Sequence, residues 1–228
     1  MPVMQTYRVE FHCHTVYSKD SLTKPRDLVD SARQIGLDRL IVTDHNSMGG
    51  AFACKEIDPE LVILGEEIMT TQGELLASFM TEEIPHSLSP MEAIQRLREQ
   101  GAFISVSHPM DPHRGWKKED LLEIIPHVDA IETFNSRCMS AIYNEAALAF
   151  AKEHNIPGTV GSDAHVTREL GRAILELPAF NNGDELRAVI RDGRPVVKLS
   201  SPAIHFTSRY AVFKKKLFPR QRPPKPRN

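Results

Sequence analysis

Two histidines near the start of the chain share one face of an expected strand. The segment FHCHTVYSKDS places His12 and His14 two residues apart, at the end of the largely apolar run YRVEF. Because alternate residues of a strand point to the same side, both imidazoles point one way and Cys13 points the other. Two neutral imidazoles are costly to bury unless their lone pairs find a partner, and a metal ion is a good partner. On this segment alone, a pair of surface histidines remains the alternative.

Residues of metal-ligand type also end most of the other expected strands, whose interiors are Val, Ile and Leu. They are His45 after LDRLIVT, Glu67 in ELVILGEE, His108 after AFISVS, and Asp163 and His165 in IPGTVGSDAH. Five of the ten histidines belong to this strand-end set, which favours a metal site over a chance grouping. We expect the other five to be solvated surface residues: His86, His113, His127, His154 and His205.

The number of candidate ligands points to more than one metal ion. A single tetrahedral zinc takes four ligands, whereas the addition of Asp20 and Glu74 brings the candidates to nine. Such a set suits two or three divalent ions with a bridging carboxylate, and we expect Glu67 to be the bridge. Cys13 is expected to be a buried thiol that faces the surrounding helices. We expect Asp44 to orient His45 or to stabilise a turn, rather than to bind metal.

The elements that position these residues alternate along the chain. Amphipathic helices are expected over residues 24–36, 89–101, 117–125 and 140–155, between apolar runs that are typical of buried strands. The run GELLASFM is expected to be the second arm of a hairpin with ELVILGEE. Strands separated by helices imply a mainly parallel sheet covered on both faces, and about seven such units favour a barrel over an open sheet. Both would place the candidate ligands at the carboxyl ends of the strands.

Composition excludes several classes of protein. The 228 residues carry a net charge of −2 with 25% charged residues, so the chain as a whole does not attract nucleic acid. No apolar run approaches the roughly 18 residues of a membrane-spanning helix, and the first residues lack the apolar core of a signal peptide. The three cysteines show no CxxC spacing, which argues against a disulfide framework and for a reducing compartment. We therefore expect a cytoplasmic protein that is not transmembrane.

Several residues just beyond the expected strand ends could recognise phosphate. The planar fork of arginine suits phosphate oxygens, and Arg114, Arg137 and Arg168 all occupy such positions, as does the amide of Asn135. The alternative for each arginine is an ordinary surface residue. Other hydrolytic and phosphate-binding motifs do not compete, because GSDAH lacks the GxSxG pattern and no GxxxxGK[ST] occurs.

Taken together in order, these motifs resemble the polymerase and histidinol phosphatase (PHP) domain family. The resemblance spans roughly residues 7 to 200 and is carried by FHCHTVYSKDS, VTDHNSMGG, LGEEI, VSHPMDPHR and GSDAH. It implies a distorted seven-stranded (β/α) barrel, similar to a TIM barrel, with a cluster of zinc, manganese or iron ions at the carboxyl ends of the strands. By this likeness, three ligand sets are expected: His12, His14, Glu67 and Asp163; Glu67, His108 and a residue near Glu74; and Asp20, His45 and His165. Many members carry a histidine at the position of Glu74, and a carboxylate there changes the charge and the metal preference.

The function expected from this cluster is hydrolysis of a phosphate ester of a small phosphorylated molecule by a metal-bridging hydroxide. One alternative is a nuclease-like phosphodiesterase that acts on short nucleic-acid ends. The other is a non-catalytic, PHP-like regulatory module that only binds metal. The intact set of candidate ligands argues against this last alternative.

The end of the chain differs in composition from the rest. Beyond a domain over residues 1–205, residues 206–228 are rich in basic residues and in prolines. We expect this segment to be a disordered, solvated tail. The alternative is an anchor for anionic lipid or nucleic acid, which the aromatic residues of HFTSRYAVFKKKLF would suit.

Overall fold

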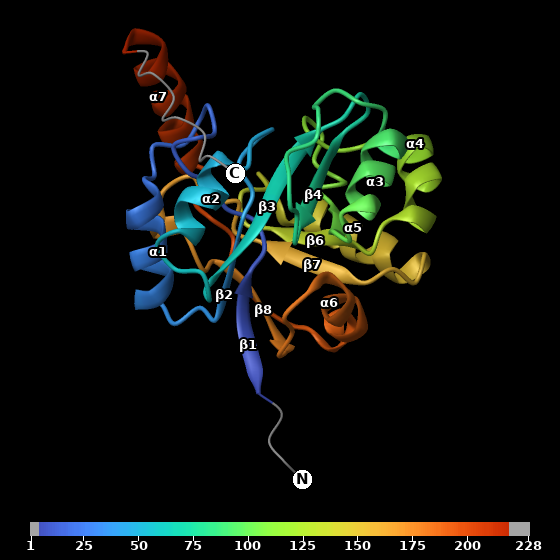
Figure 1. Ribbon diagram of the computed structural model, residues 1–228. Coiled ribbons are helices and arrows are strands. Elements are labelled where there is room, and N and C mark those ends of the chain that lie inside the picture. Colours follow the sequence, from blue (N-terminus) through green and yellow to red (C-terminus); the bar gives the residue numbers. More distant parts are fainter. Residues whose placement is uncertain (1–4, 219–228) are drawn as a thin grey trace.

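A single mixed sheet forms the centre of the molecule (Figure 1). The computed structural model describes residues 5–218, and within this range nine strands follow the order β7-β6-β5-β4-β3-β2-β1-β8-β9. The strands are β1 (Thr6–Glu10), β2 (Arg39–Val42), β3 (Val62–Met69), β4 (Glu74–Ser78), β5 (Phe103–Val106), β6 (Ala130–Asn135), β7 (Gly158–Gly161), β8 (Ala173–Pro178) and β9 (Arg194–Val197). The sheet curves into a nearly closed barrel, which confirms the expected α/β class.

The expected seven-stranded barrel differs from the observed sheet in number and direction of strands. Strands β1, β2 and β3 are parallel, as are β5, β6 and β7. Between these groups, β4 runs antiparallel to both β3 and β5, so the expected hairpin is present. At the other edge, β8 runs antiparallel to β1 and β9. The antiparallel strands are additions that sequence alternation alone does not distinguish from parallel ones.

The helices cover the outside of the sheet (Figure 1). They are α1 (Pro25–Gln34), α2 (Gly49–Lys55), α3 (Pro90–Glu99), α4 (Lys118–Ile124), α5 (Ala141–Glu153), α6 (Gly183–Val189) and α7 (Ile204–Leu217), with short 3-10 turns η1 (Ile125–His127), η2 (Thr167–Glu169) and η3 (Ile190–Asp192). Figure 1 shows α1 and α2 on one side of the barrel and α3, α4 and α5 on the other. This arrangement leaves the carboxyl ends of the parallel strands free for a site.

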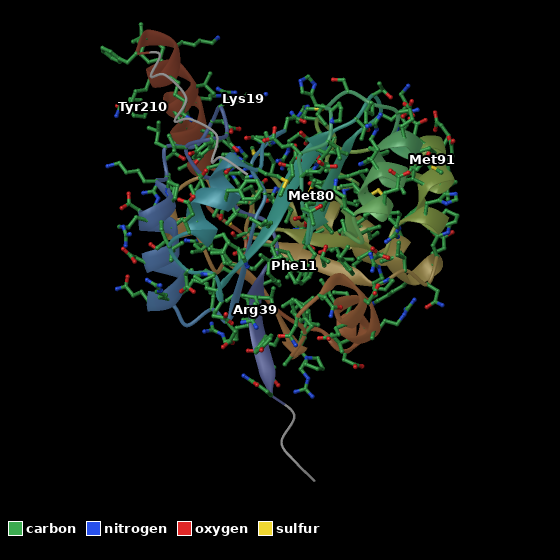
Figure 2. The ribbon with its side chains drawn as sticks, in the orientation of Figure 1. Phe11, Lys19, Arg39, Met80, Met91 and Tyr210 are labelled. Carbon is green, nitrogen blue, oxygen red and sulfur yellow. The ribbon has the colours of Figure 1, made fainter. Side chains whose placement is uncertain are left out.

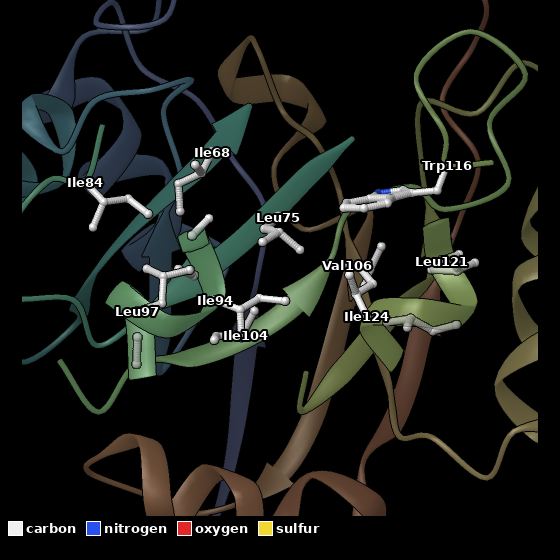
Figure 3. Packing of buried hydrophobic residues seen from close by; sticks show 14 of the residues in the cluster. Ile68, Leu75, Ile84, Ile94, Leu97, Ile104, Val106, Trp116, Leu121 and Ile124 are labelled. Carbon is white, nitrogen blue, oxygen red and sulfur yellow. The ribbon is translucent and has the colours of Figure 1, made fainter. Parts of the chain in front are cut away.

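Helix α3 illustrates how local sequence and packing agree. Ser89 caps its N-terminus by accepting a hydrogen bond from the backbone of Glu92, whose carboxylate accepts one from the backbone of Ser89 in return. Ile94 and Leu97 on its inner face are buried against β4 and β5 in a hydrophobic cluster that also contains Trp116 (Figure 3). Full burial of one such aliphatic side chain stabilises the fold by about 1.5–3 kcal/mol, so this face holds α3 to the sheet.

The chain just after β7, an edge strand of the sheet, pairs with the chain just after β1, an inner strand, and so nearly closes the barrel. Cys13 and Ala164 form a parallel bridge, in which the backbone nitrogen of His14 donates to the carbonyl of Ala164 at 2.9 Å. Gly161 is required at this junction, because a Cβ atom there would collide with the Cβ of His12. Cys13 itself is fully buried among residues of α1 and α2, as expected. The HxH and GSDAH motifs are therefore neighbours.

The expectation of a disordered tail from residue 206 is wrong for the part that the structure describes. Residues Ile204–Leu217 form α7, which projects from the barrel (Figure 1). The remainder of the expected tail, residues 219–228, lies outside the described residues. Within residues 5–218, none of the helices combines the length and the apolar composition that crossing a bilayer requires.

Candidate metal centre

The loops after the parallel strands bring all nine expected ligands to one buried cluster. His12 and His14 follow β1, Asp20 lies in the loop after them, and His45 follows β2 and forms a bridge with Glu67 of β3. Glu74 begins β4, His108 follows β5, and Asp163 and His165 follow β7. The cluster consists of His12, His14, Asp20, His45, Glu67, Glu74, His108, Asp163 and His165. Seven of these residues are at most 6% exposed, and only Asp20 and His45 are half-buried.

His12 and His14 form the centre of the cluster, and their Nε2 atoms lie 3.1 Å apart. Oε2 of Glu67 lies 3.3 Å from Nε2 of His12 and 3.5 Å from Nε2 of His14. Oδ1 of Asp163 lies 3.6 and 3.2 Å from the same two nitrogens. Glu67 and Asp163 thus both lie beside the two histidines with which the family resemblance grouped them.

His108 and Glu74 approach Glu67 from the side of β4 and β5. Nε2 of His108 lies 3.2 Å from Oε1 of Glu67 and 3.1 Å from Oε2 of Glu74. Glu74 is the first residue of β4, where it pairs with Met69 of β3, and it is only 6% exposed. The alternative that Glu74 is an exposed acidic residue is therefore wrong.

Asp20 joins His45 and His165 at the outer rim of the cluster. Its Oδ2 atom lies 3.2 Å from Nε2 of His165 and 3.6 Å from Nε2 of His45. Nδ1 of His45 also lies 2.9 Å from Oε2 of Glu67, which connects the rim to the centre. The carboxylate of Glu67 thereby contacts three imidazoles through one oxygen and a fourth through the other.

The donor atoms of this cluster fit divalent cations. Oε2 of Glu67 and Oδ1 of Asp163 are buried and accept no hydrogen bond from the described residues. Although burial raises it, the imidazoles of His12 and His45 hold the pKa of Glu67 well below its usual range, so the carboxylate is ionised. Three overlapping triads have ligand atoms within 4.8 Å of one another: His14, His45 and His165; His12, His14 and Glu67; and His45, Glu67 and Glu74. Buried acceptors without donors are satisfied when a cation lies among them.

Glu132 of β6 is a functional residue that the sequence reasoning missed. Its Oε1 atom lies 2.9 Å from Nδ1 of His12, and its Oε2 atom accepts hydrogen bonds from the backbone of His108 at 2.9 Å and from Asn135 at 3.0 Å. A carboxylate beside Nδ1 accepts a hydrogen bond from that nitrogen, which directs the Nε2 lone pair of His12 toward the cluster. The sequence could have indicated this role, because Glu132 is an acidic residue inside the otherwise largely apolar strand AIETFN.

Asp44 is a structural residue of the loop that follows His14. Its carboxylate accepts hydrogen bonds from the backbones of Thr15 and Ser18 at 2.7 and 3.0 Å, and from the hydroxyl of Ser18 at 2.6 Å. The oxygen of that hydroxyl in turn lies 3.1 Å from Nδ1 of His14 and accepts from the backbone of His45 at 3.0 Å. Asp44 thus supports both histidines through Ser18, in line with the expectation that it orients a ligand.

Two residues of the cluster adopt backbone conformations that side chains disfavour. The φ angles of His108 and Asp163 are 25° and 52°, in the left-handed region. Such conformations cost of order 1–3 kcal/mol each and persist where the surrounding structure enforces them, typically at functional sites. For Asp163, the hydrogen bonds of Oδ2 from Arg114 at 2.8 Å and from Asn135 at 3.3 Å supply this constraint.

A cavity of about 520 Å³ opens onto the cluster. Asp20, His45, Glu74 and His165 contribute to its wall, together with Arg114 and Arg137. His113 and His205, which we expected to be ordinary surface residues, also line it.

The four residues expected to bind substrate have different environments. Arg114 lines the cavity and has a side chain that is 33% exposed, whereas Arg137 is nearly buried and donates to the hydroxyl of Ser208 at 2.9 Å. Asn135 is 1% exposed and its amide is used by Glu132 and Asp163, so it holds carboxylates rather than facing the cavity. Arg168 is an exposed residue of η2 and does not line the cavity.

Replacement of Arg114 by alanine is expected to lower kcat/KM for a phosphate ester by about 10- to 100-fold, because a guanidinium that contacts both Asp163 and the cavity can orient phosphate oxygens. Steady-state kinetics and metal analysis of the purified variant measure this effect. Arg168→Ala is the matched control and should keep wild-type kinetics. Equal kinetics in both variants would exclude Arg114 from substrate binding, whereas loss of metal in Arg114→Ala would reduce its role to support of Asp163.

Comparison with known proteins agrees with this geometry. The profile of the PHP domain matches residues 10–106, and the profile described as PHP-associated matches residues 141–195. The uncharacterized protein MJ0417 of Methanocaldococcus jannaschii is 36% identical over 182 residues, which are 76% of this chain and 72% of that protein. The protein named "Probable phosphatase PBPRB2022" of Photobacterium profundum is 25% identical over 203 residues, 72% of this chain and 81% of its own length.

A solved structure with the same fold is the lesion-specific endonuclease PfuEndoQ of Pyrococcus furiosus. It aligns with a TM-score of 0.59 and 17% identity, over 87% of this chain and 60% of the endonuclease. The two matched ranges together include eight of the nine clustered residues, and only His108 lies outside them. From the matching profiles, the related protein of M. jannaschii and the arrangement of the strands, the chain belongs to the PHP domain family.

Proposed function

We propose that this protein is a metal-dependent phosphoesterase that hydrolyses a phosphate ester of a small phosphorylated molecule. The observation that carries the proposal is the convergence of nine buried or half-buried ligand residues beside a cavity that Arg114 and Arg137 line. Carboxylates and imidazoles in this arrangement suit zinc, manganese or iron, and the number of donors suits two or three ions. When bound, such ions lower the pKa of a shared water to supply an attacking hydroxide and neutralise the charge on phosphate oxygens.

The side chains around the cluster have distinct roles in this proposal. Glu67 bridges the donor sets, since its two oxygens contact four imidazoles. Glu132 fixes the ring of His12, and Asn135 fixes the position of Asp163. Arg114, already bound to Asp163, extends its guanidinium into the cavity wall and orients the phosphate of the substrate.

The cavity favours a small substrate over a polymer. A volume of about 520 Å³ is in the usual range for small-molecule sites. The endonuclease with the same fold supports a second candidate, a phosphodiesterase that acts on short nucleic-acid ends. A module that only binds metal is disfavoured, because such modules have no need for arginines beside the cavity.

The two enzymatic candidates are separated by one experiment. The manganese-loaded protein is assayed against a panel of small phosphomonoesters and against short oligonucleotides, with release of phosphate and shortening of the oligonucleotide as readouts. We expect phosphate release from at least one phosphomonoester and intact oligonucleotides. Shortening of oligonucleotides without phosphate release would support the second candidate, and inactivity toward both classes would contradict a phosphoesterase.

Substitution Glu74→Gln is expected to weaken one metal site. The change keeps the size of the side chain but replaces a charged donor 3.1 Å from His108 by a weaker neutral one. The apparent affinity for Mn²⁺ should fall about 10- to 100-fold, with activity partly restored by excess manganese. Titration with Mn²⁺ while activity is followed measures the effect, and the exposed Glu82→Gln is the control. Unchanged metal affinity in Glu74→Gln would remove this residue from the proposed centre.

We also propose a cytoplasmic location. Cys13, Cys54 and Cys138 are all free and buried, and burial raises the pKa of each thiol. Thiols without disulfide partners are usual in a reducing compartment.

A further inference from the structure

Charge is divided unevenly along the chain. Residues 204–228 contain eight Lys and Arg and no Asp or Glu, whereas residues 1–203 contain 20 Lys and Arg against 30 Asp and Glu. The protein thus consists of an acidic body followed by a strongly basic segment. The described part of that segment is α7, which lies outside the residues matched by either family profile.

One side of α7 holds the helix to the site. Ile204 and Ala211 are buried on this side, and the hydroxyl of Ser208 accepts a hydrogen bond from Arg137. Farther along the helix, the ammonium group of Lys215 donates to the carbonyls of Val16 and Ser18, in the loop after His14. The direction of α7 relative to the barrel is therefore fixed by contacts.

The opposite side of α7 carries an exposed apolar stripe. Phe206, Tyr210, Phe213 and Leu217 are 70%, 58%, 59% and 56% exposed. Their spacing of four, three and four residues places them along one narrow line of a helix with 3.6 residues per turn. Helix α7 projects from the barrel (Figure 1), with Tyr210 on its exposed surface (Figure 2). Four large apolar side chains in one exposed line are unusual unless the line meets a partner.

Basic residues flank this stripe. Arg209 and Lys216 lie on one side of it and Lys214 lies on the other, and all three are exposed. An apolar line between cationic side chains is the pattern of a helix that lies in the interface of an anionic bilayer. Apolar side chains then enter the boundary of the acyl chains, while Lys and Arg contact phosphate groups of the lipids.

We propose that α7 docks this protein peripherally onto anionic phospholipid surfaces, with its apolar stripe in the bilayer interface. The charge distribution favours this partner, because an anionic surface attracts the basic segment and repels the acidic body, which sets the orientation of the protein. A nucleic acid would use the basic residues but not a continuous aliphatic and aromatic line, whose last member, Leu217, cannot stack on bases. The proposal is independent of the chemistry of the candidate metal centre.

Vesicle flotation with the full chain tests the proposal. Vesicles of equal parts phosphatidylglycerol and phosphatidylcholine are compared with vesicles of phosphatidylcholine alone. Wild-type protein should bind the anionic vesicles about tenfold or more tightly than the neutral ones, and salt should weaken this binding. Equal binding to both vesicles, or binding to neither, would overturn the proposal.

Variants with matched controls locate the docking surface. Phe213→Ser should reduce binding to anionic vesicles by about 10-fold or more, because it removes an aromatic side chain that the bilayer interface would bury. Ile142→Ser, at a position 61% exposed on α5, should not reduce binding. The pair Lys214→Glu and Lys216→Glu should abolish the preference for anionic vesicles, and Lys117→Glu with Lys118→Glu should retain it. An unchanged melting temperature in every variant shows that the fold is intact.

Two further measurements test the other occupants of the stripe. Light scattering of the lipid-free protein detects self-association, and competition with a single-stranded oligonucleotide detects nucleic-acid binding at the same residues. If the protein forms a dimer and Phe213→Ser dissociates it, the stripe binds a second copy of the chain and lipid docking is overturned. If an oligonucleotide displaces the protein from vesicles at a lower concentration than soluble phosphatidylglycerol headgroups do, the partner is a nucleic acid instead.

Discussion

The Glu67→Gln variant is expected to lose roughly 10³-fold in kcat/KM toward a phosphate ester, since several kcal/mol of transition-state stabilisation depend on the ligands of the metal centre. Glu67 is 1% exposed, and its oxygens lie between 2.9 and 3.5 Å from nitrogens of four histidines. Glutamine preserves the shape of the side chain but removes the negative charge shared by those contacts. Steady-state kinetics with saturating manganese, together with metal analysis, measure the loss.

Glu60→Gln is the matched control for this variant, because it makes the same chemical change at an exposed position shortly before the strand that carries Glu67. It should retain wild-type activity and metal content. If Glu67→Gln kept wild-type turnover with a full complement of metal, Glu67 would not be the bridging residue, and the proposed arrangement of the centre would have to be abandoned.

Removal of metal is expected to abolish activity and to lower the melting temperature by roughly 10 °C. In the absence of cations, the buried carboxylates of Glu67 and Asp163 each keep one oxygen that accepts no hydrogen bond from the described residues. A metal ion that binds only the folded state adds about 4 kcal/mol per site to the free energy of unfolding when the free metal concentration exceeds the dissociation constant a thousandfold. Calorimetry before and after dialysis against a chelator measures the change, with zinc, manganese and iron added back separately.

The same calorimetric experiment on Glu67→Gln serves as the control for removal of metal. Its melting temperature should respond much less to the chelator, because the variant holds less metal at the start. A wild-type protein that stays fully active and equally stable after exhaustive removal of metal would contradict a metal-dependent phosphoesterase.

The positions of the candidate ligands could be predicted because parallel strands end at the same edge of a sheet. A residue at the end of an apolar run, such as His45 or His108, therefore lies near others of its kind whatever the details of the loops. The same logic correctly placed Cys13 against α1 and α2, because residues of a strand alternate between faces. Glu74 could be placed because a short hairpin fixes the register of β3 and β4.

Residues beyond the strand ends were predicted less well, because the direction of a side chain there depends on the path of the loop. Arg168 is near the end of β7 in sequence, but η2 turns it toward solvent, whereas Arg114 reaches Asp163 from the same kind of position. His113 and His205 both line the cavity. The position of His113 just beyond a strand end was a sign of this, whereas nothing in the local sequence of His205 distinguishes it from a surface histidine. Glu132 was overlooked because its role depends on a contact with His12 across 120 residues.

The end of the chain shows how composition averages over unlike segments. The proline-rich character of residues 206–228 comes entirely from residues 219 onward, which contain four prolines, whereas the basic residues are divided equally between the two parts. Residues 204–217 contain none, and their apolar residues recur every three or four positions, as in a helix. A shorter window would have separated α7 from the residues that follow it.

The junction between β1 and β7 has a consequence for the order in which the protein forms. The backbone of Ser162 donates a hydrogen bond to the carboxylate of Glu10, 152 positions away in the chain. The next residue, Asp163, places its carboxylate beside the imidazoles of His12 and His14. During synthesis the first two histidines emerge early, but their partners appear only after about two thirds of the chain has been made. Contacts of such long sequence separation form slowly and late. Nascent chains therefore cannot bring the whole cluster together, and capture of metal by the complete proposed centre would mark a chain whose barrel has already closed.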